Sequence, residues 1–184
     1  MGAKKNVTKE MILRVGMAIV EEGEIVNINA RLLAKRLSCS TQPIYDSFKN
    51  MDDFKEQLLD YVRSFYYSFI ETNRDKKDNL YFQYMKNYLK FAHDHPNLFQ
   101  FIFVLNRRKE TMEEKRFNEE IIEGIMKAGN YSLEAAKGFF IQSWVFSHGI
   151  AMQLCQKYID WDFNDVLHLL NDNFEALRMF YKGK

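Results

Sequence analysis

Residues 38–49 read Ser-Cys-Ser-Thr-Gln-Pro-Ile-Tyr-Asp-Ser-Phe-Lys, which is the pattern of a tight turn followed by a short helix. Ser40 is a favourable N-cap for that helix, and Pro43 falls in its first turn, where backbone amides have no helical partner. Ile44 and Phe48 are four residues apart and are expected to face the core. The opposite face carries Thr41, Gln42, Tyr45, Asp46 and Lys49. This polar face, with one aromatic hydroxyl, suits a DNA groove better than plain solvent.

Two further short helices are expected before this turn. One apolar stripe predicts a helix over residues 30–37, with Ala30, Leu33, Ala34 and Leu37 at the spacing i, i+3, i+4, i+7. Asn27 or Asn29 can cap it, and Ser38 takes the turn position in which glycine is common. An earlier helix begins at Thr8 and ends before Gly23, as expected for a glycine at C′. Three short helices in this order indicate a helix-turn-helix DNA-binding domain.

Residues 8–60 resemble the N-terminal domain of the TetR family of one-component repressors. The matching elements are Gly23, residues 33–40 (Leu-Ala-Lys-Arg-Leu-Ser-Cys-Ser), residues 44–50 (Ile-Tyr-Asp-Ser-Phe-Lys-Asn) and residues 51–54 (Met-Asp-Asp-Phe). The family usually has a glycine where this chain has Ser38, and an aromatic residue where it has Asp46.

The resemblance implies a DNA-contacting set, which comprises Asn29, Ser40, Thr41, Gln42, Pro43, Tyr45, Asp46 and Lys49. Within it, Tyr45 and Lys49 are implied to hold phosphates, while Thr41 and Gln42 reach base edges; a glutamine can pair with adenine. Asp46 could accept a hydrogen bond from a cytosine amino group or could repel a phosphate, and the sequence leaves both open.

The composition favours a helical protein with a sizeable core. Hydrophobic residues make up 47% of the 184-residue chain and aromatic residues 15%, whereas two prolines and eight glycines leave few breaks. The formal charge of +1 gives the whole chain no general affinity for nucleic acid, but residues 1–50 hold eight basic and five acidic residues. That local excess is modest and has the sign that phosphate contact needs.

Six longer helices are expected after residue 50, over 50–72, 80–93, from 96 to about 103, 111–129, 132–157 and 164–181, and no strand pattern is present. Asn50 and Ser132 are their clearest caps, and Thr111 with Glu114 has the spacing of a capping box. The prediction is therefore an all-α fold of about nine helices. It divides into a helix-turn-helix domain over 1–50 and a ligand-binding and dimerisation domain over 51–184.

This nine-helix layout resembles the TetR family over the whole chain. Residues 88–103 and the run Trp-Val-Phe-Ser-His-Gly at 144–149 also resemble the subfamily named for a Trp-His-Gly signature. An effector site is expected among the aromatic and polarizable residues Phe65, Phe99, Phe103, Trp144, His148 and Met152. Trp144, His148 and Met152 recur every four residues and share one helix face. The sequence leaves open whether this cluster is a pocket or plain core.

A homodimer is expected through the last two helices. The eighth helix carries several small residues, which allow close helix contact, and an apolar stripe runs along the ninth. The interface residues predicted on this basis are Phe140, Ser147, Ala151, Leu170, Phe174 and Leu177. The alternative is that both helices pack only within one chain. Two-fold symmetric proteins read palindromes, so palindromic double-stranded DNA is the expected partner.

No catalytic residue, metal ligand set or cofactor is predicted, because the sequence lacks a zinc-protease motif, a phosphate-binding glycine loop and a nucleophile–base–acid set. Cys39 and Cys155 are isolated and suit a reducing cytoplasm. No apolar run is long enough to span a bilayer, so no membrane partner is expected. These features favour a cytoplasmic transcriptional regulator, expected to be a repressor released by a small apolar effector. The alternative is a helical ligand-binding or adaptor protein without specific DNA binding.

Overall fold

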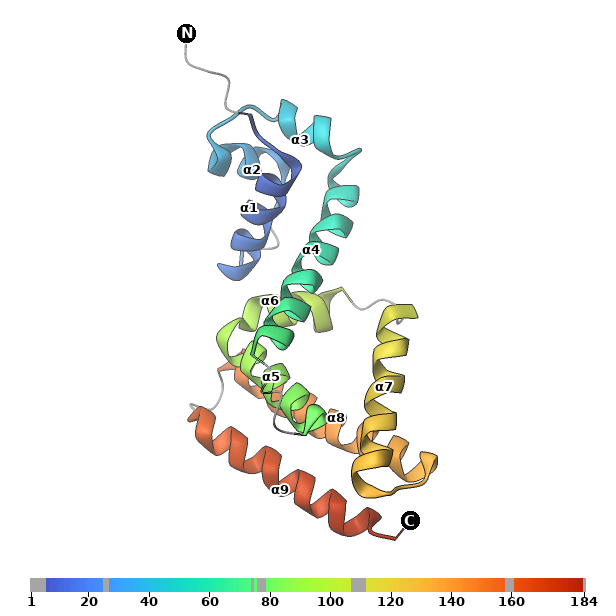
Figure 1. The fold of residues 1–184 in the computed structure, drawn as a ribbon. Coiled ribbons are helices and arrows are strands. Elements are labelled where there is room, and N and C mark those ends of the chain that lie inside the picture. Colours follow the sequence, from blue (N-terminus) through green and yellow to red (C-terminus); the bar gives the residue numbers. More distant parts are fainter. Residues whose placement is uncertain are drawn as a thin grey trace. The chain divides into compact units, whose positions relative to one another are not determined.

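The computed structural model describes residues 6–24, 27–73, 75, 79–106, 112–157 and 161–183. Within these ranges it is entirely helical and has no strand, which confirms the predicted all-α fold of about nine helices. The helices, shown in Figure 1, are α1 (Lys9–Glu21), α2 (Ala30–Leu37), α3 (Gln42–Ser47), α4 (Met51–Thr72), α5 (Leu80–Asp94), α6 (Pro96–Gln100), α7 (Met112–Gly129), α8 (Leu133–Gln156) and α9 (Phe163–Tyr181). A π-helical turn, Phe101–Leu105, directly follows α6.

The chain consists of two compact units. Unit 1 contains Met1–Tyr67 and Asn97–Arg107, and unit 2 contains Ser68–Pro96 and Arg108–Lys184. The predicted domain boundary after residue 50 lies at the start of α4, whereas the units divide within the last turns of that helix. Most of α4, and α6 from Asn97 onward, therefore belong to the same unit as the three short N-terminal helices.

Local capping signals set the ends of the helices in unit 1. The Thr8 hydroxyl accepts from the Met11 amide at 3.3 Å, and the Asn29 side chain accepts from the Leu32 amide at 3.0 Å, which confirms both as N-caps. Gly23 follows α1 with φ of +82°, as its predicted C′ role requires.

The segment 97–107 is tied to α1 within unit 1 by a side-chain contact. The Asn97 amide donates to the carbonyl oxygen of Glu21 at 2.7 Å, which satisfies one of the carbonyls left unpaired at the end of α1. The same side chain lies 3.4 Å from the position that a Cβ would occupy on Gly23. This contact explains why a segment distant in sequence belongs to the N-terminal unit.

The prediction that Ser40 caps the third helix is wrong. Thr41 occupies the N-cap position of α3, and its side chain makes no capping hydrogen bond. Pro43 explains the difference: with Ser40 as N-cap, the amide at the third helical position would be that of Pro43, which has no N–H. The helix begins one residue later, and the Ile44 amide bonds to the Thr41 carbonyl oxygen at 3.1 Å.

Unit 2 is built around the pair α5 and α8, against which α7 and α9 pack. Asn79 caps α5 by accepting from the amides of Tyr81 and Phe82, and Ser132 caps α8 by accepting from the Ala135 amide at 3.2 Å. The stripe of α9 that faces this core is buried in the single chain, and comprises Val166, Leu170, Phe174, Leu177 and Tyr181. The capping box predicted for residues 111 and 114 lies outside the described side chains.

Candidate nucleic-acid interface and ligand pocket

The short helix α3 has one buried face and one exposed face. Ile44 is 1% exposed and Phe48 3%, so both belong to the core of unit 1 as predicted. The side chains of Gln42, Tyr45, Asp46 and Lys49 are exposed, as are Asn29 and Ser40, while Thr41 and Pro43 are half-buried. Tyr45 is 56% exposed, which is unusual for a large aromatic side chain and leaves its hydroxyl accessible. The whole predicted DNA-contacting set therefore lies at or near the surface.

A hydrogen bond fixes two of these side chains to each other. The Gln42 side-chain amide donates to a carboxylate oxygen of Asp46 at 2.7 Å, one helical turn away. Because the amide nitrogen is directed at Asp46, the amide oxygen of Gln42 is the group that remains as an acceptor. The sequence left the role of Asp46 open, and in this structure the carboxylate orients Gln42.

Charged contacts hold the ends of the helix-turn-helix. The guanidinium of Arg36 on α2 makes a two-point contact with the carboxylate of Glu22 after α1, at 3.0 and 2.5 Å. Hydrogen bonding from Arg36 lowers the pKa of Glu22. At the other end, the Asp53 carboxylate accepts from the Lys49 amide at 2.8 Å and from the Gln57 side chain. These two hydrogen bonds, that from Gln57 above all, lower the pKa of Asp53.

The predicted effector residues divide between the two units. Phe65, Phe99 and Phe103 lie in unit 1, where the rings of Phe99 and Phe103 are 4.7 Å apart and Phe103 meets Tyr66 edge-on at 5.3 Å. Phe99 is fully buried, and Phe65 and Phe103 are half-buried. In unit 1, these aromatic residues therefore contribute to the core.

Trp144, His148 and Met152 lie on α8 in unit 2 and share one face, as the spacing predicted. The Trp144 and His148 rings stack with centroids 5.3 Å apart and planes 12° apart, and the Tyr88 hydroxyl is 2.8 Å from Nδ1 of His148. Trp144 is 36% exposed, whereas His148 and Met152 are half-buried. These three side chains therefore form a partly open aromatic surface within unit 2.

Five of the six predicted dimer-interface residues are buried inside the single chain, so that part of the prediction is wrong. They are Ser147, Ala151, Leu170, Phe174 and Leu177, all at most 7% exposed. An apolar stripe on a helix does not reveal whether its partner is the same chain or another one, and here α5 and α8 cover it. Phe140 is half-buried. The large apolar side chains that are exposed on these helices are Leu133, Ile141, Trp144 and Val145 on α8, and Leu169, Met179 and Phe180 on α9.

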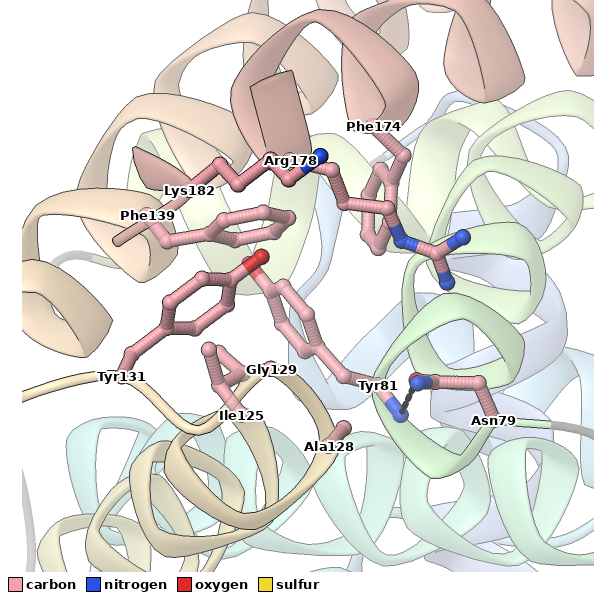
Figure 2. A pocket seen from close by; sticks show the side chains of 10 residues that line it. All are labelled: Asn79, Tyr81, Ile125, Ala128, Gly129, Tyr131, Phe139, Phe174, Arg178 and Lys182. Atoms are coloured by element: carbon pink, nitrogen blue, oxygen red, sulfur yellow. Dashed lines mark hydrogen bonds between the residues drawn. The ribbon is translucent and has the colours of Figure 1, made fainter. Parts of the chain in front are cut away.

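A pocket that the sequence did not predict lies within unit 2 (Figure 2). Its volume is about 390 Å³, and its walls come from α5, the end of α7, the turn after it, α8 and the end of α9. The lining residues are Asn79, Tyr81, Ile125, Ala128, Gly129, Tyr131, Phe139, Phe174, Arg178 and Lys182. Of these, only Phe174 had been singled out, and for a different role. The sole local signal was the pair Gly129 and Asn130, which predicts a helix end but no cavity.

No helix in the described part of the chain is long and apolar enough to cross a membrane. Among the described residues, no three His, Cys, Asp or Glu side chains are grouped so that they could hold a metal ion. No known protein-family model matches the chain, and no curated protein matches it.

We expect Cys155 to resist alkylation in the folded protein. The residue is 7% exposed, its sulfur lies 3.7 Å from the Ala92 carbonyl oxygen, and burial raises the pKa of the thiol to about 12. At about pH 8 the reactive thiolate is therefore scarce. Mass spectrometry after iodoacetamide treatment should show Cys39, which is half-buried, modified well before Cys155. In denaturant both should react alike, and equal rates in the folded protein would contradict the burial of Cys155.

Proposed function

We propose that the protein is a DNA-binding transcriptional regulator of the TetR type, acting as a homodimeric cytoplasmic repressor that a small molecule releases from a palindromic operator. The observation that carries this proposal is the exposed polar face of α3. Gln42 and Tyr45 are exposed on a short helix whose opposite face is buried through Ile44, and the exposed Lys49 directly follows Phe48, the buried residue that ends the helix. In this arrangement the surface tyrosine and ammonium can donate to phosphates, while the amide oxygen of Gln42 can accept from a base edge.

The left-handed turn before α3 supports the same proposal. Ser38 has φ of 53° and ψ of 49°, and the backbone reverses there so that α2 and α3 pack across each other. A helix-turn-helix requires such a reversal to present its second helix to the major groove. The Arg36–Glu22 contact also links α2 to the end of α1 within unit 1, although both side chains are partly exposed and water weakens the pair.

The dimer that we propose would use exposed rather than buried apolar side chains of the last two helices. Ile141 and Val145 on α8 are 57% and 56% exposed, and Met179 and Phe180 on α9 are 79% and 57% exposed. Ile141 and Val145 are one helical turn apart and therefore lie on one face. Exposed apolar residues grouped in this way are typical of protein–protein contact surfaces.

We expect specific and salt-sensitive DNA binding, which selection of bound sequences from random DNA should reveal as a palindromic motif. Lys49→Ala and Tyr45→Phe should weaken binding about equally on all sequences, and Lys49→Ala should reduce the salt slope by about 1. Gln42→Ala should cost roughly 1–3 kcal/mol at particular base pairs only. Fluorescence anisotropy on the selected site measures all three.

A charge-matched control is Lys115→Ala in unit 2, whose side chain is also exposed. It should leave DNA affinity unchanged. Affinity that does not change between low and moderate salt would rule out phosphate contact as the basis of binding. Absence of any enriched sequence would instead favour the second candidate.

That second candidate is a helical ligand-binding protein without specific DNA binding. The Asp46 carboxylate favours it, since a negative charge is exposed on the face of α3 and would stand close to the phosphates of a duplex. Asp46→Asn separates the two functions: it should strengthen DNA binding if the carboxylate repels phosphates. The amide of an asparagine retains the acceptor for Gln42.

A further inference from the structure

The pocket in unit 2 has the size and the walls of a small-molecule site. A volume of about 390 Å³ lies within the range of about 300–1,000 Å³ that is typical of ligand pockets. Its residues come from four helices and one turn, and all of them belong to unit 2. The pocket is therefore formed by unit 2 alone.

Four aromatic rings form the inner wall of the pocket (Figure 2). The Tyr81 and Phe174 centroids are 5.3 Å apart, Phe174 meets Phe139 edge-on at 5.5 Å, and Tyr131 stacks on Phe139 at 6.1 Å with planes 26° apart. Tyr81, Phe139 and Phe174 are at most 4% exposed, so these three rings are held rigidly by the core. Such a wall favours a flat apolar body, because aromatic rings bind one another through their faces and edges.

The position of the fourth ring, that of Tyr131, depends on the absence of a Cβ atom at Gly129. Asn130 has φ of 52°, and the Tyr131 amide bonds back to the Met126 carbonyl oxygen at 3.1 Å, so the chain turns sharply at the end of α7. This turn lays the Tyr131 ring against the backbone of Gly129. A Cβ on Gly129 would lie only 1.9 Å from that ring, which real atoms never do. Any side chain at this position must displace Tyr131 from the wall.

The pocket also carries positive charge that no carboxylate in its lining balances. Arg178 and Lys182 are one helical turn apart at the end of α9, and both line the pocket, whereas none of the described residues in the lining is Asp or Glu. Arg178 donates through Nη1 to Glu175 at 2.9 Å, but both side chains are about half exposed, so water screens this pair. A guanidinium has five donors in a fixed fork and suits the two oxygens of a carboxylate.

From this combination we infer that the pocket binds a small organic anion with an aromatic body. The rings of Tyr131, Phe139 and Phe174 hold the body, and Arg178 with Lys182 holds the carboxylate. The inference concerns unit 2 alone and does not rest on DNA binding by α3. A failure of one proposal therefore leaves the other in place.

The test uses the full chain and 2-naphthoate as the probe, with 2-naphthamide as its uncharged counterpart, in isothermal titration calorimetry. Naphthoate should bind more tightly than the amide by about tenfold or more, because only the carboxylate forms a charge-assisted pair with Arg178. Arg178→Gln should remove most of that preference. Glu175→Gln should act in the opposite direction and tighten naphthoate binding, since it removes the competing carboxylate.

Two glycines on α7 provide a matched pair of variants for the aromatic wall. Gly129→Ala should displace Tyr131 and weaken both probes. Gly124→Ala, on the same helix with nothing within 4 Å of the new methyl group, should leave binding unchanged. Lys115→Gln is the charge control outside the lining and should also have no effect.

Several results would overturn the inference. They are naphthoate binding weaker than millimolar in the unmodified protein, equal affinity for the acid and the amide, or Arg178→Gln without effect. A loss of naphthoate affinity in Lys115→Gln equal to that in Arg178→Gln would also count against it, because it would indicate general attraction of anions rather than a site. Thermal unfolding of each variant separates a lost site from a lost fold.

Discussion

Phe54→Ala is expected to lower the free energy of unfolding of unit 1 by about 3–5 kcal/mol. The Phe54 side chain is fully buried, and its ring meets that of Phe48 edge-on at 5.1 Å. Its removal leaves a cavity where α4 meets the helix-turn-helix, and typical domains have only about 5–15 kcal/mol of stability in total. Circular dichroism during guanidinium titration should show the loss. Lys55→Ala, at the next and exposed position, should change stability little.

The packing of Phe54 can also be tested by a substitution on α1, which lies against its ring. A Cβ on Gly16 of α1 would lie 2.8 Å from the Phe54 ring and 3.1 Å from Leu58, both of which are fixed in the core. Gly16→Ala should therefore be destabilising by overpacking, even though alanine is the better helix former. Combined with Phe54→Leu, which shortens the opposing side chain, the same alanine should cost less. Strict additivity of the two substitutions would contradict direct contact.

Phe174→Glu is expected to unfold unit 2 rather than merely separate two subunits. Phe174 is 4% exposed and contacts the rings of Tyr81, Phe82 and Phe139. A carboxylate there would lose the ring contacts and be moved out of water, and Arg178, one turn further along α9 and half exposed, would offset only part of a cost of about 5 kcal/mol. Far-ultraviolet circular dichroism should show lost helix content at room temperature.

Phe180 on the same helix is the matched control for that substitution. It is 57% exposed, so Phe180→Glu should leave the helix content intact. If the protein is a dimer through the exposed residues of α8 and α9, Phe180→Glu or Val145→Glu should give folded monomers in sedimentation velocity. A folded Phe174→Glu variant would show that the α9 stripe is not the core of unit 2.

The helices and their ends could be predicted because their signals are local. Thr8, Asn29 and Ser132 cap helices by accepting from amides three residues away, and the positions of Gly23 and Ser38 follow from left-handed turns. The exception is α3, where the missing amide of Pro43 outweighs the preference for serine as a cap, and where the helix ends at Ser47 although its predicted period continues to Phe48 and Lys49. The exposure of Gln42, Tyr45, Asp46 and Lys49 was nevertheless predictable from their polarity and spacing.

The pocket in unit 2 could not be predicted, because it is made by segments that are distant in sequence. Asn79 and Tyr81, the turn at Tyr131, Phe139 and the end of α9 meet only in the folded unit. A helical period identifies which residues share a face of one helix, as it did for Trp144 and His148, but it does not identify what covers that face. For the same reason it could not distinguish a dimer interface from the core on α9.

The conformation of Ser38 has a consequence for how this turn can change over evolution. A left-handed backbone costs a residue with a side chain roughly 1–2 kcal/mol, whereas glycine adopts it freely. Glycine, however, gives the unfolded chain more freedom, which costs a folded protein about 0.4–1 kcal/mol relative to a residue with a side chain. The first cost is the larger, so Ser38→Gly should stabilise the folded protein by up to about 1 kcal/mol. Selection on stability alone therefore favours glycine at this turn, and a serine there has a small stability cost.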